Sequence, residues 1–542
     1  MNKMKKYIII SIVALSSLFS AQAQVSKSVT YPASLEINQA KSVWFNTTNA
    51  AGMIITPVDN FNLLTVGYSN ENGEYKLQQD GDSKNNLAIS TEGATNLGEA
   101  RIWGKFQYNN STINGTKFNT IMLDPVADMP YYIADPNKSY WKKQSYDMEL
   151  KAATPVLWDV VGFGIAAKYY TKTGAKQIDP RCSSFKYGIS ATPSVIVKIG
   201  ENHTIGLSAT YENSFERTTP INSDSQHDQD AYVMKGLGNY SVGVVGGLGG
   251  LSIFYYKQNL VGGAIQYGYH SDFDVLAEGN YSYQVIDVFQ TPSKPKRMGS
   301  TVQTKMGGNI QAIFNGDYTS KVTVDGYYKN TNGIEFIQEL DKTYEVQQWV
   351  TMAKFIRSYY KFTAASLNYD LFKVSEQGYD WRAGLKATYS DRSDEYILPK
   401  STLAAKNVYA ELNGKKNFMV GNSSVLLGVN VGYNYNIDGG YDYTGANPTS
   451  TVVKEMFERD IAFLTANYIQ AGINVNASFP VSKSSALYVQ GDCQYIRSND
   501  HTNNLVGMTD ADGSNFRWET ISSILQTPSQ RIFATVSVGF TF

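Results

Sequence analysis

The chain has 542 residues, a formal net charge of −1 and a sequence pI of about 6.5. This balance provides no basic surface for nucleic acid, so that class of partner is not expected. Tyrosine dominates the aromatic residues, with 39 copies. Its amphipathic side chain suits a membrane–water boundary, although a soluble all-β protein has a similar composition.

Residues 1–23 have the pattern of a secretory signal peptide. Three lysines precede the apolar run YIIISIVALSSLF, and Ala21 and Ala23 supply the small residues of a cleavage site. No later apolar run approaches the ~18 residues that a transmembrane helix needs. The sequence therefore predicts an exported chain, cut after Ala23, without a helical membrane anchor.

Residues 24–60 precede the first strand-like pattern and form a separate N-terminal segment. Two interpretations stay open for it: a periplasmic or lumen-inserted plug, and an arm that only covers the barrel. The segment is too short for the globular plug of an energy-coupled receptor. Active import powered from the inner membrane is therefore not expected.

Residues 61–542 are predicted to form the barrel, because apolar and polar residues alternate in segment after segment. In the segment 161–169, for example, Val161, Phe163 and Ile165 alternate with Gly162 and Gly164. A period of two places the apolar set on one face of a strand. About sixteen to eighteen such segments follow one another, each close to the ~10 residues of a tilted membrane-crossing strand.

The fold class that this pattern predicts is all-β: a transmembrane antiparallel β-barrel with short periplasmic turns and long extracellular loops. Connections alternate between short and long, and many apolar faces end in Tyr, Phe or Trp, as expected for aromatic girdles. Such a sheet must close, because lipid offers no partner for an edge strand. A soluble β-sandwich or propeller is the alternative.

Two stretches do not fit the simple alternation. The stretch 359–372, YYKFTAASLNYDLF, is apolar on both faces, which indicates a bulge or a filled interior. The glycine-rich stretch 239–256 is either one more hairpin or a long folded loop. In the next segment, 379–389, Tyr379 is assigned to the apolar outer face together with Trp381 and Leu385.

The last strand, RIFATVSVGFTF, resembles the C-terminal signal by which outer-membrane barrels are recognised for insertion, with Val538, Phe540 and Phe542 in the matching positions. The stretches 63–86 and 99–111 are similar to the opening hairpins of an uncharacterised Gram-negative outer-membrane β-barrel family, which has only a domain-of-unknown-function label. The resemblance implies a barrel in the cell outer membrane and no activity. A fainter resemblance, of NTTNAAGM to a turn of long-chain fatty-acid channels, lacks that turn's proline.

No catalytic, cofactor-binding or metal site is predicted. His203 and His270 fall in short turns, and His227 and His501 fall in long loops, so none lies beside a serine on a strand face as a hydrolase needs. The acidic stretches 222–230 and 509–515 are interpreted as solvated turns. The second lacks the glutamate that ends a calcium-binding EF-hand loop.

The inward set of charged residues is of mixed sign, unlike the single-sign rings of ion-selective pores. These residues either form a polar pore wall or pair with one another and with the N-terminal segment. The predicted function is a passive channel or uptake pore for a small solute. The alternative is a plugged barrel that serves as an accessory or docking partner for a surface lipoprotein or receptor. Outer-membrane lipids and the barrel-insertion machinery are expected partners. The candidate lumen-facing residues are Arg101, Lys105, Lys168, Arg382, Lys386, Glu411 and Asp492.

Overall fold

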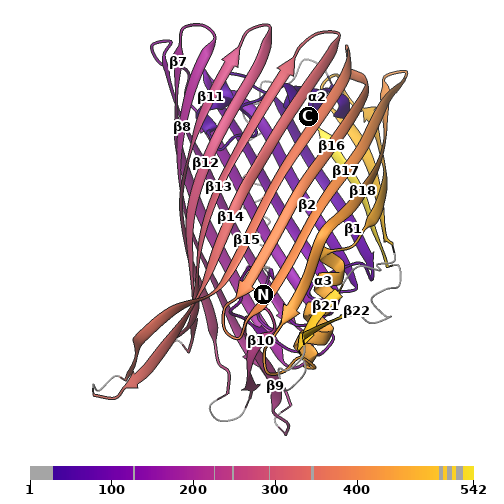
Figure 1. The fold of residues 1–542 in the computed structure, drawn as a ribbon. Helices are drawn as coiled ribbons and strands as arrows, with labels where there is room; N and C mark the ends of the chain where they lie inside the picture. The colour runs from indigo at the N-terminus through magenta and orange to yellow at the C-terminus, as the bar shows by residue number, and fades with distance from the viewer. Residues whose placement is uncertain are drawn as a thin grey trace, which may run out of the picture.

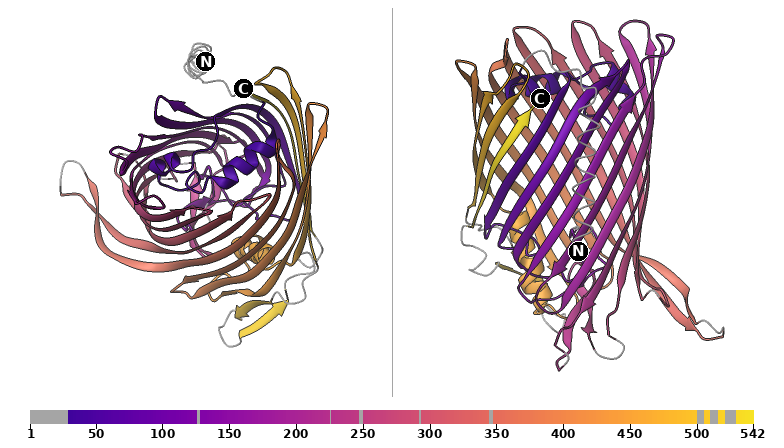
Figure 2. Two further views of the ribbon diagram at one scale, coloured as in Figure 1. Left: turned by 90° about the horizontal axis from the view of Figure 1, so that it is seen from above. Right: turned by 180° about the vertical axis from the view of Figure 1, so that it is seen from behind.

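The structure is a computed structural model that describes residues 29–125, 128–224, 226–246, 250–291, 293–343, 347–499, 505–509, 516–520 and 529–542. Eighteen antiparallel strands form a closed barrel (Figures 1 and 2). The first strand, β1 (Phe61–Gly73), pairs with the last, β23 (Gln530–Thr541). Each barrel strand therefore has a neighbour on both sides, as the hydrocarbon region of a membrane requires.

The strands between them follow the chain from neighbour to neighbour. They are β2 (Ser83–Leu97), β3 (Ala100–Thr116), β5 (Ser139–Ala153), β6 (Val161–Lys176), β7 (Arg181–Ile199), β8 (His203–Ile221), β11 (Phe254–His270), β12 (Phe273–Gln290), β13 (Lys296–Phe314), β14 (Tyr318–Asp341), β15 (Gln348–Ser375), β16 (Gly378–Tyr396), β17 (Ser401–Val420), β18 (Ser423–Tyr443), β19 (Tyr468–Pro480) and β20 (Ala486–Ser498).

The two ends of the barrel differ in their connections. Turns such as 98–99 and 271–272 join strands at the periplasmic end, at the top of Figure 1, whereas 117–138, 222–253 and 444–467 join strands at the extracellular end. The predicted fold class, with short periplasmic turns and long extracellular loops, is confirmed.

The outer surface is apolar because apolar and polar side chains alternate along each strand, and the apolar ones point outward. On β18, Val429 and Val431 are exposed to 59% and 54%, while Asn430 and Asn434 point into the barrel. Similar rows of exposed Val, Ile, Leu and Tyr side chains recur around the barrel, where lipid can cover them. Within the described residues, no helix is long and apolar enough to cross a membrane.

The described part of the N-terminal segment, residues 29–60, lies inside the periplasmic end (Figure 2, left). It contains the helix α2 (Pro32–Lys41) and the 3₁₀ helix η1 (Ala50–Ile54). Trp44 is fully buried between this segment and the wall. The described residues contain no separate globular plug domain, and this short segment occupies the periplasmic mouth instead.

At the extracellular end, loops fold inward and form a feature that we call the inner cap: residues 117–125, 128–138, 229–245 and 452–464. It includes a three-stranded sheet of β4 (Ile133–Ala134), β9 (Gln229–Gly236) and β10 (Asn239–Val245). It also includes the π-helix η2 (Val452–Phe457) and the helix α3 (Glu458–Leu464). The glycine-rich stretch is thus partly a hairpin within a folded loop. Two short strands, β21 (Leu505–Thr509) and β22 (Phe516–Thr520), pair beside β18.

A hydrophobic cluster joins the inner cap to the wall. Phe118 and Met234 of the cap pack with Tyr360 and Tyr441 of the wall and with Phe457 of η2. At the other end, Phe372 packs against Ala33 and Ile37 of α2. The apolar inner face of the stretch 359–372 therefore reflects a filled interior, with Tyr360 against the inner cap and Phe372 against the N-terminal segment.

Tyr379 does not face outward as predicted. It is fully buried, stacks edge-on with Phe372 and donates a hydrogen bond from its hydroxyl to Glu36. The cause is a β-bulge: Lys373 pairs with Trp381, but Val374 pairs with Tyr379, so the residue between them has no partner. An extra residue in one strand exchanges the two faces beyond it.

Candidate functional site

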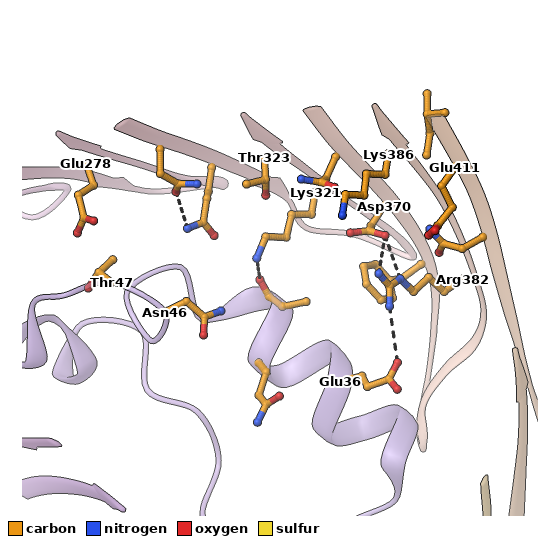
Figure 3. Close-up of a pocket in the computed structure, with 18 residues that line it drawn as sticks. Glu36, Asn46, Thr47, Glu278, Lys321, Thr323, Asp370, Arg382, Lys386 and Glu411 are labelled. Atoms are coloured by element: carbon orange, nitrogen blue, oxygen red, sulfur yellow. Dashed lines mark hydrogen bonds and ion pairs between the residues drawn. The ribbon is translucent and has the colours of Figure 1, made fainter. Parts of the chain in front are cut away.

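A polar chamber of about 680 Å³ lies between the N-terminal segment and the wall strands β12 to β17 (Figure 3). The segment contributes Glu36 and Asn46, and the wall contributes Glu278, Lys321 and further residues. Carboxylates, ammonium groups and amides face one another across this space. Three of the predicted lumen residues meet there: Arg382, Lys386 and Glu411.

Glu36 is the main contact between α2 and the wall. Its carboxylate accepts hydrogen bonds from Lys415 Nζ at 2.6 Å and from the Tyr379 hydroxyl at 2.7 Å, and it lies 3.8 Å from Arg382. Arg382 also donates to Asp370 at 2.7 Å. This network is partly accessible to water, so its ion pairs hold the segment without the large cost of full desolvation.

Two wall lysines bind the backbone of the N-terminal segment. Lys321 Nζ donates to the carbonyl of Ala40 at 2.9 Å, near the carboxyl end of α2. A cation suits this position because the last helical carbonyls lack backbone partners. Lys151 Nζ donates to the carbonyls of Phe45 at 2.8 Å and Thr47 at 3.1 Å.

The turn before η1 is held by amide and hydroxyl groups. Asn49 Nδ2 donates to the Val195 carbonyl and to Gln266 Oε1, both at 3.0 Å. The backbone N–H of Ala51 donates to Ser194 Oγ at 3.1 Å. These bonds satisfy polar groups that burial would otherwise leave unpaired.

Wall glycines allow the close approach of this segment. A Cβ on Gly164 would overlap the backbone of Ala51, and a Cβ on Gly378 would overlap the backbone of Ser34. Gly378 also has a φ of +110°, which favours glycine on its own. The periplasmic mouth is therefore shaped to receive residues 29–60.

The predicted lumen residues all lie on the inner side of the wall, and most have a partner there. Arg101 is buried and donates to Asn60 Oδ1 at 2.6 Å and to the Val58 carbonyl. Lys105 pairs with Glu92 at 3.4 Å, and Lys168 pairs with Glu149 at 2.8 Å. Glu411 accepts from the Tyr409 hydroxyl at 2.6 Å, and Asp492 accepts from Asn474 and Gln490.

The structure does not bring these seven residues into one site. Arg101 binds the end of the N-terminal segment, Arg382, Lys386 and Glu411 line the chamber, and Lys105, Lys168 and Asp492 form local pairs along the wall. Glu36, Lys321 and Lys415 are not among the residues predicted from the sequence. The wall lysines could have been found from strand alternation, but no sequence signal distinguished Glu36.

Buried charge in the inner cap is compensated in pairs. Lys176 and Asp135 are 2.7 Å apart and almost completely buried. Asp128 accepts from Lys329 at 2.9 Å and from Thr331 at 2.8 Å. Burial alone would raise the pKa of the Asp128 carboxyl, but these neighbours outweigh burial and lower it.

Each described histidine lies beside a nearby side chain. His203 lies 2.7 Å from the Tyr267 hydroxyl, His270 pairs with Asp274, and His227 pairs with an exposed aspartate in the same loop. No group of three or more potential metal ligands occurs in the part of the chain that the structure describes. His501 and residues 510–515 lie outside the described residues, as does the predicted signal peptide.

The C-terminal strand has the outward face that its sequence predicts. Val538 and Phe542 are exposed, and the rings of Phe540 and Phe542 lie 5.9 Å apart. Recognition of these residues by the insertion machinery stays a prediction.

An apolar outer surface around a polar interior defines a membrane-spanning β-barrel of the Gram-negative outer-membrane type. The chain belongs to the family of unknown function DUF6850, whose sequence profile matches residues 50–542. This match confirms the predicted membership of an uncharacterised outer-membrane barrel family.

The barrel is also similar to solved outer-membrane structures at low sequence identity. The ferric preacinetobactin receptor BauA from Acinetobacter baumannii shares 10% identity with a TM-score of 0.40, over 89% of this chain and 80% of that chain. The FrpB iron transporter from Neisseria meningitidis shares 11% identity with a TM-score of 0.40, over 91% and 83% of the two chains. A comparison with curated protein sequences found no match.

Proposed function

We propose that this chain is an outer-membrane channel for a small polar solute, which its N-terminal segment and inner cap obstruct and which opens intermittently when they move. A barrel of this strand number has room for an aqueous passage, and its wall is polar. The observation that supports the proposal is that polar and charged side chains of the wall hold residues 29–60. Lys151, Lys321 and Arg382 bind them through ion pairs and hydrogen bonds, which water can replace when the segment moves.

No catalytic step is part of the proposed function. The mature chain, after cleavage of the signal peptide, is proposed to lie among outer-membrane lipids. Val538, Phe540 and Phe542 are its proposed contact with the insertion machinery.

Planar-bilayer recording of the purified protein tests the channel. The native chain is expected to show stepwise openings, and deletion of residues 32–57 is expected to lengthen or enlarge them because the periplasmic mouth is then empty. Ile473→Leu, a conservative change on the lipid-facing side of β19, serves as the control. Silence of both the native and the deleted chain contradicts the channel.

A specific observation favours a second candidate, the accessory or docking role. Strand β14 pairs with β13 only as far as Ile334, and strand β15 pairs with β16 only as far as Ser358. Beyond these residues they form a two-stranded hairpin that projects from the barrel (Figure 1). Ile337, Met352 and Phe355 on this hairpin are exposed, and exposed apolar clusters commonly mark protein contacts.

Photo-crosslinking from position 352 in intact cells tests this role. One discrete protein adduct at the cell surface, absent when the crosslinker is placed at the inward Asn430, supports docking. A native chain that stays silent in bilayers and conducts only after deletion of residues 32–57 also supports it. No discrete adduct from position 352 contradicts it.

A further inference from the structure

A second interior cavity, of about 280 Å³, lies beneath the inner cap. Its wall comes from β2, β3, β5 and β6, and its lid is the loop at Leu123 and Asp124. Three lysines line it: Lys84, Lys143 and Lys172. The remaining lining side chains are mostly amides and hydroxyls, including Asn86, Asn109, Ser111 and Ser145.

The loop presents its own anion to these lysines. The Asp124 carboxylate lies 2.8 Å from Lys172 Nζ, and Lys143 Nζ donates to the carbonyl of Leu123. Burial alone would raise the pKa of the Asp124 carboxyl, but Lys172 and Lys143 outweigh burial and lower it. The carboxylate is thus held as an anion in a cationic setting.

The loop is seated here by specific contacts. The backbone N–H of Leu123 donates to Glu216 at 2.8 Å. Gly174 leaves room for the Leu123 side chain, which a Cβ at position 174 would strike. Asp124 itself remains partly accessible, with 46% of its side chain exposed, so a solute carboxylate can reach the position that it occupies.

An unused hydrogen-bond acceptor lies on a residue that lines the cavity. Asn86 Oδ1 is buried and has no hydrogen-bond partner. An unsatisfied buried acceptor is unfavourable, and a solute hydroxyl group can satisfy it once the Asn86 amide turns toward the cavity. The volume lies near the lower limit for small-molecule sites, so the solute must be small.

From this combination we infer that the cavity binds a small hydroxylated carboxylate, such as an acidic monosaccharide, whose carboxylate replaces that of Asp124 on Lys172, with Lys143 as a neighbouring cation. A solute hydroxyl donates to Asn86 Oδ1. Binding does not require conduction, so the site can exist whether or not the barrel is a channel.

Calorimetric titration of the full-length protein in detergent with D-glucuronate tests the site, with glucose and acetate as comparison probes. Glucuronate is expected to bind at one site and more tightly than either probe, because only glucuronate has both groups. Lys172→Gln is expected to weaken glucuronate binding about tenfold or more, since it removes a charged hydrogen bond. Lys172→Arg, which keeps the charge, is expected to retain most of the affinity.

The Asp124→Asn variant is the decisive test. It removes the internal competitor and is expected to tighten glucuronate binding several-fold, opposite to the effect of Lys172→Gln. The matched control is Lys305→Gln on β13, an inward lysine that packs over the Tyr327 ring and lies away from this cavity. Glucose binding as tight as that of glucuronate overturns the inference, as does an Asp124→Asn variant that binds more weakly than the native protein.

Discussion

Lys176 and Asp135 illustrate, at the scale of single residues, how charge is kept inside this protein. Lys176 Nζ also donates to the Pro180 carbonyl at 3.0 Å, and the Thr120 hydroxyl donates to Asp135 at 2.5 Å. Burying two ions costs several kcal/mol, and their attraction offsets that cost only when the remaining polar groups are also satisfied. Here they are satisfied, so the pair joins the inner cap to β6.

Lys176→Met is expected to destabilise the protein by about 3–5 kcal/mol, because it leaves a buried aspartate without its cation. The double variant Lys176→Met with Asp135→Asn is expected to lose much less. Urea unfolding of the refolded barrel in detergent measures both. Equal losses for the single and the double variant contradict an energetic coupling between the two side chains.

Asp460 on α3 is a second residue whose charge depends on its surroundings. It is partly buried and accepts a hydrogen bond from the backbone N–H of Gln78 at 3.2 Å. Burial raises the pKa of its carboxyl to about 7. The docked state of α3 therefore holds its proton more tightly than the undocked state does.

Docking of α3 is accordingly expected to weaken as the pH rises from about 4, the ordinary pKa of an aspartate, to about 7, the raised pKa of Asp460. Above that range, the contribution of Asp460 to the docking of α3 is fully lost and no longer changes with pH. Hydrogen exchange of residues 458–464, compared at pH 5 and pH 7.5 after correction for intrinsic rates, measures the change. Asp460→Asn should remove the pH dependence, and a variant that keeps it rules out Asp460 as the cause.

At the scale of elements, each barrel strand separates lipid from lumen by alternation. On β19, Ile473 is 53% exposed to the outside, whereas the neighbouring Asn474 points inward and donates to Asp492. The two residues share a strand and a depth, so only the face on which they lie differs. Substitutions of these two residues therefore compare the lipid-facing side of the strand with its lumen-facing side.

Ile473→Arg is expected to cost about 2–4 kcal/mol and to reduce insertion into lipid vesicles, because a charge then faces hydrocarbon. Asn474→Arg should be tolerated better, since its guanidinium can pair with Asp492. The protease-protected, heat-modifiable fraction of each variant measures insertion. Similar insertion of the two variants would contradict the assigned faces.

At the scale of the whole molecule, the interior of the barrel is occupied at both ends, which makes two obstructions in series along the proposed passage. Residues 29–60 occupy the periplasmic end, and the inner cap occupies the extracellular end (Figure 2). In between, polar cavities remain next to each obstruction. If ions pass both obstructions in turn, their electrical resistances add. The obstruction with the larger resistance then limits the current until that resistance is reduced.

Loosening both ends is therefore expected to raise bilayer conductance by more than the sum of the separate effects. Gly164→Leu loosens the periplasmic end, because its side chain would overlap Ala51, and Lys176→Met loosens the inner cap. Gly491→Ala is the control, since a Cβ there meets nothing within 4 Å. Additive effects of the two variants would contradict a single passage with two obstructions.

Much of this architecture could be predicted from the sequence alone. The strand faces, the alternation of short and long connections and the inward position of Arg382 or Asp492 all follow from a period of two, which is a local property of the chain. Bulges interrupt that period without an obvious sequence signal, which is why the outward position predicted for Tyr379 is wrong.

What only the tertiary structure decided is what fills the barrel. Glu36 and Lys415 are 379 positions apart in the chain, and the inner cap combines loops from three separate connections. Such contacts depend on the space that remains after closure and on which loops can reach it. The sequence by itself determined a barrel with an apolar outside and a polar inside. The tertiary structure decided that both of its ends are occupied, because occupancy of a lumen is a property of the closed wall and not of any one strand.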